Sequence, residues 1–389
     1  MRKTKVLIIV LAVIFMVTSF GFAAPRLVPS GPSTDNEGQT NLSSTINYEK
    51  MIKILNDIER TSKGTVEVFT LDEYGKSEQG RSLYVAKVGE GDTKVWVQAS
   101  IHGDEQLVSE AVLDVLKTLG SNGAKDVQTI LDNVTIYAIP MYNPDGIEMN
   151  TRSTMLIDQD TGEPLLDQDG DPRYIDLNRD WKVDLMGEGF GFVASESRAL
   201  YEFWTEVKPD FALDMHHQGI KEMPDSNKSV SFSLGISLAP NGPTLPGLKD
   251  GEYNDLTRQL QSYVYDDIKD YGYSHIDRYV IGGEDKYEID IVGGVVSAMM
   301  LGINYDNLNE EGHSCPAVFF ETKGNTRDGN LGQRANGYLT KQNYHALKSF
   351  LYGIASEEVY HVNPDSWEEI PRHPIIGYFT DYAGVIVIE

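Results

Sequence analysis

The chain has 389 residues, enough for one large domain or two ordinary ones, and its 33 basic against 59 acidic residues give a formal net charge of −26. Such an acidic balance argues against a nucleic-acid partner or an anionic membrane surface, because both need a basic face. Cys315 is the only cysteine, so an internal disulfide is excluded and stability must come from an ordinary core or from a bound metal.

The first residues have the pattern of a secretory signal peptide. Arg2, Lys3 and Lys5 precede an uncharged run over 6–20, and small residues follow up to Ala23. We therefore expect cleavage after residue 23 and a secreted, extracellular protein with no stable membrane association. The alternative is a membrane anchor, but the run is shorter than the ~20 apolar residues that a spanning helix needs. Residues 24–45, rich in Pro, Ser, Gly, Thr and Asn, predict a flexible segment.

The next segments alternate between helical and strand patterns. Apolar residues at helical spacing predict helices over 48–58, 105–119, 195–207, 255–271 and 339–354. Short apolar runs predict buried strands over 95–99, 134–139, 211–215 and 317–320, and residues 155–175, rich in Asp, Gly and Pro, predict a long surface loop. This alternation predicts one α/β domain with a largely covered sheet. The tail, 356–389, contains apolar runs at 375–379 and 385–388 that could add edge strands.

The junction of the first predicted strand and the following helix carries a possible metal-binding pair. His102 and Glu105 are three residues apart there, so an imidazole and a carboxylate can converge on one point. Zn²⁺ accepts both ligand types, and Gly103 would allow a sharp turn between them. The alternative is that Asp104 and Glu105 only complement the helix dipole while His102 lies on the surface.

A second candidate lies at the end of the strand predicted over 211–215. Strand alternation places Asp214 and His216 on one face and His217 on the other. Side chains of active sites collect at such strand ends in α/β sheets, so one of the two histidines can face a metal. The alternative is a pair of loop histidines beyond the strand.

A third candidate, Glu321, directly follows the last apolar strand. A carboxylate in that position is costly to bury unless it is paired or functional, and desolvation would raise its pKa toward the range of a general base. The alternative is a solvated strand-end residue that pairs with Lys323.

Taken in order, the short motifs resemble the M14 zinc carboxypeptidases over about residues 46–355. These motifs are H-x-x-E at 102–105, N-P-D-G at 143–146, D-x-N-R at 176–179, the strand-end His216 and the late Glu321. The resemblance implies a mixed, largely eight-stranded central sheet with helices on both faces. It also implies one Zn²⁺ per chain, bound by His102, Glu105 and His216.

The same resemblance assigns roles to the remaining residues. Asp176 would fix the tautomer of His102, Arg152 would stabilise an oxyanion, and Glu321 would act as general base and acid. Asn178 and Arg179 would grip the terminal carboxylate of a peptide substrate, although Asp180 adds negative charge beside them. The expected activity is therefore that of a secreted metallocarboxypeptidase. A zinc amidase or deacylase acting on cell-wall peptides or N-acyl amino acids, and an inactive binding module of the same fold, remain as alternatives.

Overall fold

The structure, a computed structural model, describes residues 45–181, 191–219, 221, 223, 228–238, 245–272, 274–279, 291–292, 294–324 and 333–373. The predicted signal peptide, nearly all of the predicted flexible segment and the apolar runs at 375–379 and 385–388 lie outside these residues. Within the described part, no helix is both long enough and apolar enough to cross a lipid bilayer.

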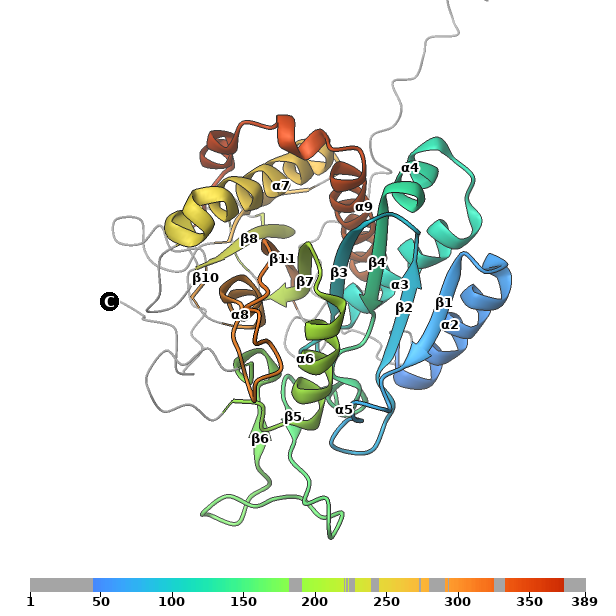
Figure 1. Cartoon of the computed structure of the whole chain (residues 1–389), viewed down its shortest axis with the longest axis vertical. Coiled ribbons are helices and arrows are strands. Elements are labelled where there is room, and N and C mark those ends of the chain that lie inside the picture. Colours follow the sequence, from blue (N-terminus) through green and yellow to red (C-terminus); the bar gives the residue numbers. More distant parts are fainter. Residues whose placement is uncertain are drawn as a thin grey trace, which may run out of the picture.

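The centre of the molecule is a mixed sheet (Figure 1), which confirms the predicted fold class. Eight strands follow one another in the order β1-β2-β4-β3-β7-β11-β8-β10, and β9 pairs with β8. The inner strands β4, β3, β7 and β11 run parallel, whereas the β1–β2, β2–β4 and β8–β11 pairs are antiparallel. β9 and β10 each pair with β8 in parallel. Their bounds are β1 Val66–Thr70, β2 Tyr84–Val88, β3 Thr93–Ala99, β4 Val134–Ile139, β7 Phe211–Gln218, β8 Phe232–Leu238, β9 Ile276–Arg278, β10 Ile291–Val292 and β11 Ala317–Lys323.

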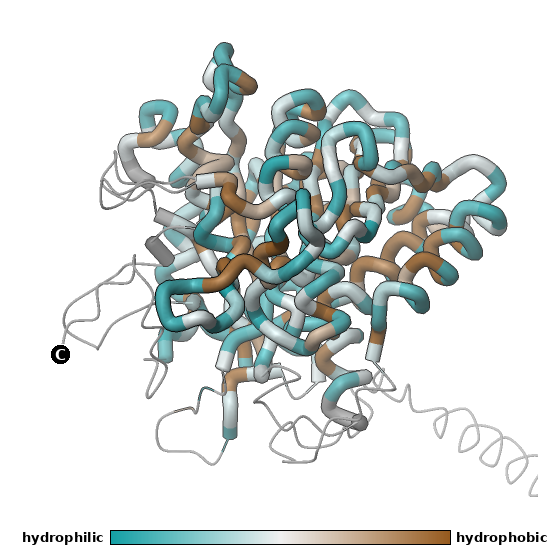
Figure 2. The backbone as a smooth tube through the Cα atoms, turned by 90° about the horizontal axis from the view of Figure 1, so that it is seen from below, coloured by the Kyte–Doolittle hydropathy of each residue, from teal (hydrophilic) through white to brown (hydrophobic). Residues whose placement is uncertain are grey.

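Helices cover both faces of this sheet. One layer contains α2 (Tyr48–Ser62), α3 (Gln106–Ser121), α4 (Lys125–Asn133), α7 (Glu252–Ile268) and α9 (Gln333–Ala355). The other contains α6 (Ser195–Val207) and α8 (Val295–Leu301). Phe320 of β11 packs against Phe350 of α9 on the first face, and Trp96 of β3 packs against Phe203 of α6 on the second. Hydrophobic segments concentrate inside the molecule, and hydrophilic loops surround them (Figure 2).

The predicted strands and helices occur close to the expected residues, with one informative difference. β4 and α6 have the predicted bounds, but β7 and β11 each extend three residues further than predicted. His216 and Glu321 therefore lie inside paired strands, not after them, and they face each other in the β7–β11 register. The last three residues of each strand are polar, which in the sequence looks like a strand end. They nevertheless pair with each other across β7 and β11, so the hydrogen-bonded ladder continues through them.

The predicted loop over 155–175 is a projecting hairpin (Figure 1). Its arms pair at β5 (Thr154–Met155) and β6 (Tyr174–Ile175), and bridges at Ile157–Pro164 and Leu166–Pro172 continue the arrangement. Leu166 and Tyr174 are 58% and 51% exposed, so the hairpin buries little of its own surface. A short helix, α5 (Pro144–Met149), precedes it.

A glycine makes room for an aromatic ring beside the strand pair that carries Glu321. Gly235 of β8 lies opposite Phe319 of β11, and a Cβ atom at Gly235 would fall 1.8 Å from Phe319 Cζ. The Phe319 ring lies 6.5 Å from the His216 ring and 5.6 Å from the Tyr279 ring, measured between centroids. The missing side chain of Gly235 therefore allows a large residue to support His216.

We expect Gly235→Ala to lower the free energy of unfolding by about 1–3 kcal/mol, because the added methyl group overpacks the Phe319 ring. Urea unfolding of the two proteins measures this difference. Gly123→Ala is the matched control, since nothing lies within 4 Å of its Cβ position. A Gly235→Ala protein as stable as wild type would show that the Phe319 ring moves freely.

Candidate metal centre and active site

The turn between β3 and α3 positions the first two candidate ligands. Ser100 has a left-handed backbone conformation with φ 53°, and its hydroxyl donates to the carbonyl oxygen of Glu105 at 2.8 Å. Glu105 is the last residue before α3. Gly103 lies in this turn, as expected, without a positive φ. Its role is close packing, because a Cβ there would fall 1.9 Å from the carbonyl carbon of Gly146 in α5.

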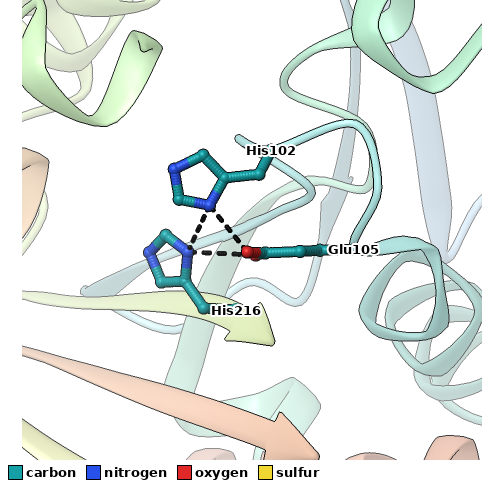
Figure 3. Close-up of side chains that lie close together, drawn as sticks. All are labelled: His102, Glu105 and His216. Atoms are coloured by element: carbon teal, nitrogen blue, oxygen red, sulfur yellow. Dashed lines mark hydrogen bonds and ion pairs between the residues drawn. The ribbon is translucent and has the colours of Figure 1, made fainter. Parts of the chain in front are cut away.

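Three polar side chains converge on one point at the carboxyl ends of β3 and β7 (Figure 3). Glu105 Oε1 lies 2.8 Å from His102 Nδ1, and Glu105 Oε2 lies 3.2 Å from His216 Nδ1. The two Nδ1 atoms are 3.3 Å apart. All three residues are buried, and their candidate ligand atoms lie within 4.8 Å of one another. The structure thus brings together residues from a turn, a helix start and a strand.

Carboxylates hold the outer nitrogen of each imidazole. His102 Nε2 lies 3.2 Å from Asp176 Oδ1, and His216 Nε2 lies 2.8 Å from Asp214 Oδ2. Because an ionised carboxylate only accepts hydrogen bonds, we place a proton on each Nε2. A neutral imidazole then has a lone pair on Nδ1, so two lone pairs and a carboxylate face one another.

That arrangement is repulsive unless a cation lies between the three groups. Burial alone would lower the pKa of His216, but Asp214 and Glu105 outweigh it and hold that pKa well above its ordinary value. The pKa of Glu105 is well below its ordinary value, since the two histidines outweigh the effect of burial. The centre therefore attracts positive charge, and two imidazole nitrogens with one carboxylate fit Zn²⁺, as do the carboxylate partners behind them.

Arg152 lies beside this centre and is bound to it. Its Nε and Nη2 atoms each lie 3.0 Å from Asp176 Oδ2, and its Nη1 lies 3.8 Å from Glu105 Oε1. Its carbonyl oxygen accepts from Gly103 N and from Asn143 Nδ2, which ties the backbone to the β3–α3 turn. Burial would raise the pKa of Asp176, but Arg152 and His102 hold it well below the ordinary value. The arginine side chain is 28% exposed, so part of it can reach a substrate.

Glu321 has the environment expected of a proton-transfer group. It pairs in register with His216, so both side chains lie on the same face of the sheet. Its Oε2 atom is buried and has no hydrogen-bond partner among the described residues. Burial raises its pKa well above the ordinary value; Glu105 and Asp214 add to this, while His216 opposes it.

Asn178 and Arg179 follow Asp176 in a 3₁₀ turn, Leu177–Arg179. Asp176 Oδ1 accepts from Asn178 N at 2.9 Å, so the residue that binds His102 also caps this turn. Arg179 Nη1 donates to the carbonyl oxygen of Asn178 at 2.9 Å. The Asp180 carboxylate accepts from the backbone N–H groups of Val193 and Ala194 at 2.8 and 2.9 Å.

His217 lies outside the ligand set, as strand alternation predicted. Its Nδ1 donates to the carbonyl oxygen of Gly324 at 2.6 Å, and burial lowers its pKa to about 4. Its backbone N–H donates to Glu105 Oε2 at 2.9 Å. This residue therefore orients Glu105 through its main chain.

Sequence reasoning missed two contributors to the site. Asp214 was placed on the same face as His216 but was given no role, although the i, i+2 spacing in a strand was a usable signal. The backbone N–H of Val295, which donates to Asn178 Oδ1 at 2.9 Å, comes from α8, a helix that the sequence analysis did not predict.

Comparisons with known proteins agree with this geometry. The zinc carboxypeptidase family model matches residues 51–218, a segment that contains the three candidate ligands, Arg152 and the 176–179 motif. Zinc carboxypeptidase A 1 of Drosophila melanogaster is 28% identical over 135 residues, which are 33% of this chain and 30% of that protein. The curated relatives that we compared are matched over only 25% to 39% of their own lengths.

Solved structures share the fold over most of the chain. Thrombin activatable fibrinolysis inhibitor has a TM-score of 0.56 at 16% identity, over 86% of this chain and 81% of that one. Carboxypeptidase A from Helicoverpa armigera has a TM-score of 0.54 at 15% identity, over 85% and 77%. The segment that the zinc carboxypeptidase family model matches thus contains the His-Glu-His centre, and these solved structures share the fold of the chain.

Proposed function

We propose that this protein is a secreted, zinc-dependent carboxypeptidase that hydrolyses the C-terminal bond of peptide substrates. The observation that carries the proposal is the pairing of two features on one face of the sheet. Three ligand-type groups converge at the carboxyl ends of β3 and β7, and the adjacent strand carries Glu321, whose Oε2 has no hydrogen-bond partner among the described residues. The predicted signal sequence supports secretion.

The chain's own residues divide the chemistry between them. His102, Glu105 and His216 hold the metal, and Asp176 and Asp214 fix the two imidazole tautomers. A bound zinc ion acidifies water and polarises the scissile carbonyl.

The remaining side chains move protons and hold the substrate. Glu321 takes a proton from the attacking water and passes it to the leaving amine, and its desolvated position keeps it basic enough to do so. Arg152 donates to the oxygen on which negative charge develops. Asn178 and Arg179 donate to the terminal carboxylate and so direct cleavage to the chain end.

The first prediction concerns metal content. We expect one tightly bound zinc per chain, lost in His216→Ala and largely retained in His217→Ala, because the second residue orients Glu105 through a backbone N–H that alanine keeps. Elemental analysis after dialysis measures this directly. The reverse pattern, or a wild-type protein with well under one equivalent that added Zn²⁺ does not restore, would contradict the ligand assignment.

The second prediction concerns proton transfer. Glu321→Gln keeps the shape of the side chain and removes its basicity, so we expect normal zinc content and a loss of kcat of about 10²–10⁴-fold or more. Glu67→Gln, at an exposed position in β1, is the control for loss of one carboxylate. If the Glu321→Gln enzyme kept a large fraction of wild-type kcat, the general base would have to be another group.

The third prediction concerns the substrate end. If Asn178 and Arg179 clamp a carboxylate, amidation of the C-terminus should lower kcat/KM by about 10²-fold or more, because charge-assisted bonds are lost in a desolvated site. One peptide chosen from a panel, assayed as free acid and as amide, decides this. Equal rates would instead favour an endopeptidase, or an amidase or deacylase. Hydrolysis of cell-wall fragments or N-acyl amino acids in the same panel would identify an amidase or deacylase.

A further inference from the structure

The start of α8 contacts both residues that we assign to the carboxylate clamp. Val295 is the first residue of this helix, and its N–H donates to Asn178 Oδ1 at 2.9 Å. Gly294 precedes it as the cap residue, with φ 85° and ψ 179°. A Cβ atom at Gly294 would fall 2.6 Å from Asn178 Oδ1 and 3.4 Å from Arg179 Nη1. The backbone of residues 294–295 therefore packs directly on the clamp, at a distance that only glycine permits.

This contact decides which end of the Asn178 amide is available to a ligand. The amide has one acceptor, its carbonyl oxygen, and two N–H donors on Nδ2. Because the Val295 N–H can only donate, it requires the oxygen to face α8. Rotating the amide by half a turn would bring two donors together and leave a donor unpaired, which is costly in a partly buried site. The donors on Nδ2 are consequently directed away from the helix start.

The helix that imposes this orientation is itself fixed to the sheet. α8 packs against β7, β8 and β11, and the hydroxyl groups of Ser297 and Ser237 hydrogen-bond to each other. Val295 and Met299 are almost completely buried. The clamp is thus connected through one short, rigid helix to the strands that carry His216 and Glu321.

We propose that the backbone of Gly294 and Val295 is a positioning element for substrate selection, which holds Asn178 with its amide N–H groups presented to the terminal carboxylate of the substrate. This inference rests on the proposed carboxypeptidase function and extends it to residues outside the segment that the family model matches. The helix start is not a binding site in its own right, since its N–H is used by Asn178.

A pair of variants at one position tests the contact made by this N–H group. Val295→Pro replaces the N–H by a ring carbon that points at Asn178 Oδ1, so the amide has to move away; proline itself is tolerated at the first position of a helix, and the ψ of 179° at Gly294 lies outside the helical region that a following proline disfavours. Val295→Ala is the matched control, because it keeps the N–H and also loses the valine side chain. Relative to Val295→Ala, we expect Val295→Pro to lower kcat/KM for the free-acid peptide about 10- to 100-fold, mainly through KM. The rate on the amidated peptide should be the same in the two variants.

A double-mutant cycle with Asn178→Ala separates positioning from general damage. If Val295 acts through Asn178, Val295→Pro does not change the ratio of kcat/KM for the free-acid peptide to kcat/KM for the amidated peptide when Asn178 is already alanine. Zinc content and melting temperature verify that each variant is folded and loaded. Calorimetric titration of the zinc-loaded protein with the free C-terminal amino acid and with its amide, neither of which has a peptide bond to cleave, gives the same comparison without catalysis.

The outcomes distinguish this inference from the function on which it rests. In one outcome, wild type prefers the free-acid peptide while Val295→Pro and Val295→Ala prefer it equally. In that case the positioning role is wrong, but the assignment of Asn178 and Arg179 to the carboxylate clamp is retained. If Val295→Pro lowers the rates on acid and amide equally, the helix start is structural only and the inference is again wrong. If wild type shows no preference in either kinetics or calorimetry, the clamp and its positioning element both fail.

Discussion

The architecture of the site depends on the electrostatic balance around two inward-facing imidazole nitrogens. Three buried or largely buried carboxylates, at positions 105, 176 and 214, surround His102 and His216. Two of them fix ring orientation from behind, and the third faces the same point as the rings. Such a concentration of negative charge is unfavourable by itself, so the surrounding fold has to supply compensation. Arg152 provides part of it by binding Asp176, and the cation at the centre would provide the rest.

This balance explains why the site is assembled from many segments. Parallel strands end at a common edge, so β3, β7 and β11 deliver their polar residues to one place, as open α/β sheets generally do. The remaining groups come from the turn after β6 and from the start of α8. Each of these segments is tied to another by hydrogen bonds from the main chain. The carbonyl of Arg152, the N–H of His217 and the N–H of Val295 all serve this purpose.

The sequence suggested the three candidate ligands through short motifs, each ambiguous alone, whose order resembles that of the zinc carboxypeptidases. His102 and Glu105 are close in the chain, and the alternation of β7 separates His216 from His217 without any knowledge of the fold. The predicted ends of β7 and β11 were three residues too early, because polar residues that pair across strands resemble loop residues in the sequence. α8 was missed because its seven residues carry too short a pattern, and with it the contact to Asn178, which spans more than a hundred residues. The need for glycine at positions 103 and 235 also depends on tertiary neighbours, Gly146 and Phe319, that no local pattern specifies.

The hairpin over 154–175 leaves and re-enters the fold beside the His-Glu-His centre. Its two stems meet at the Thr154–Ile175 pair, and the residues just outside them, Arg152 and Asp176, form an ion pair at 3.0 Å. That ion pair joins the two stems of the hairpin independently of the contacts at its tip. Since doubling the length of a closed loop costs only about 0.6 kcal/mol, the tip can gain or lose residues with little effect on the centre. The acidic hairpin is therefore a segment whose length and sequence can vary, and where a foreign segment could be inserted.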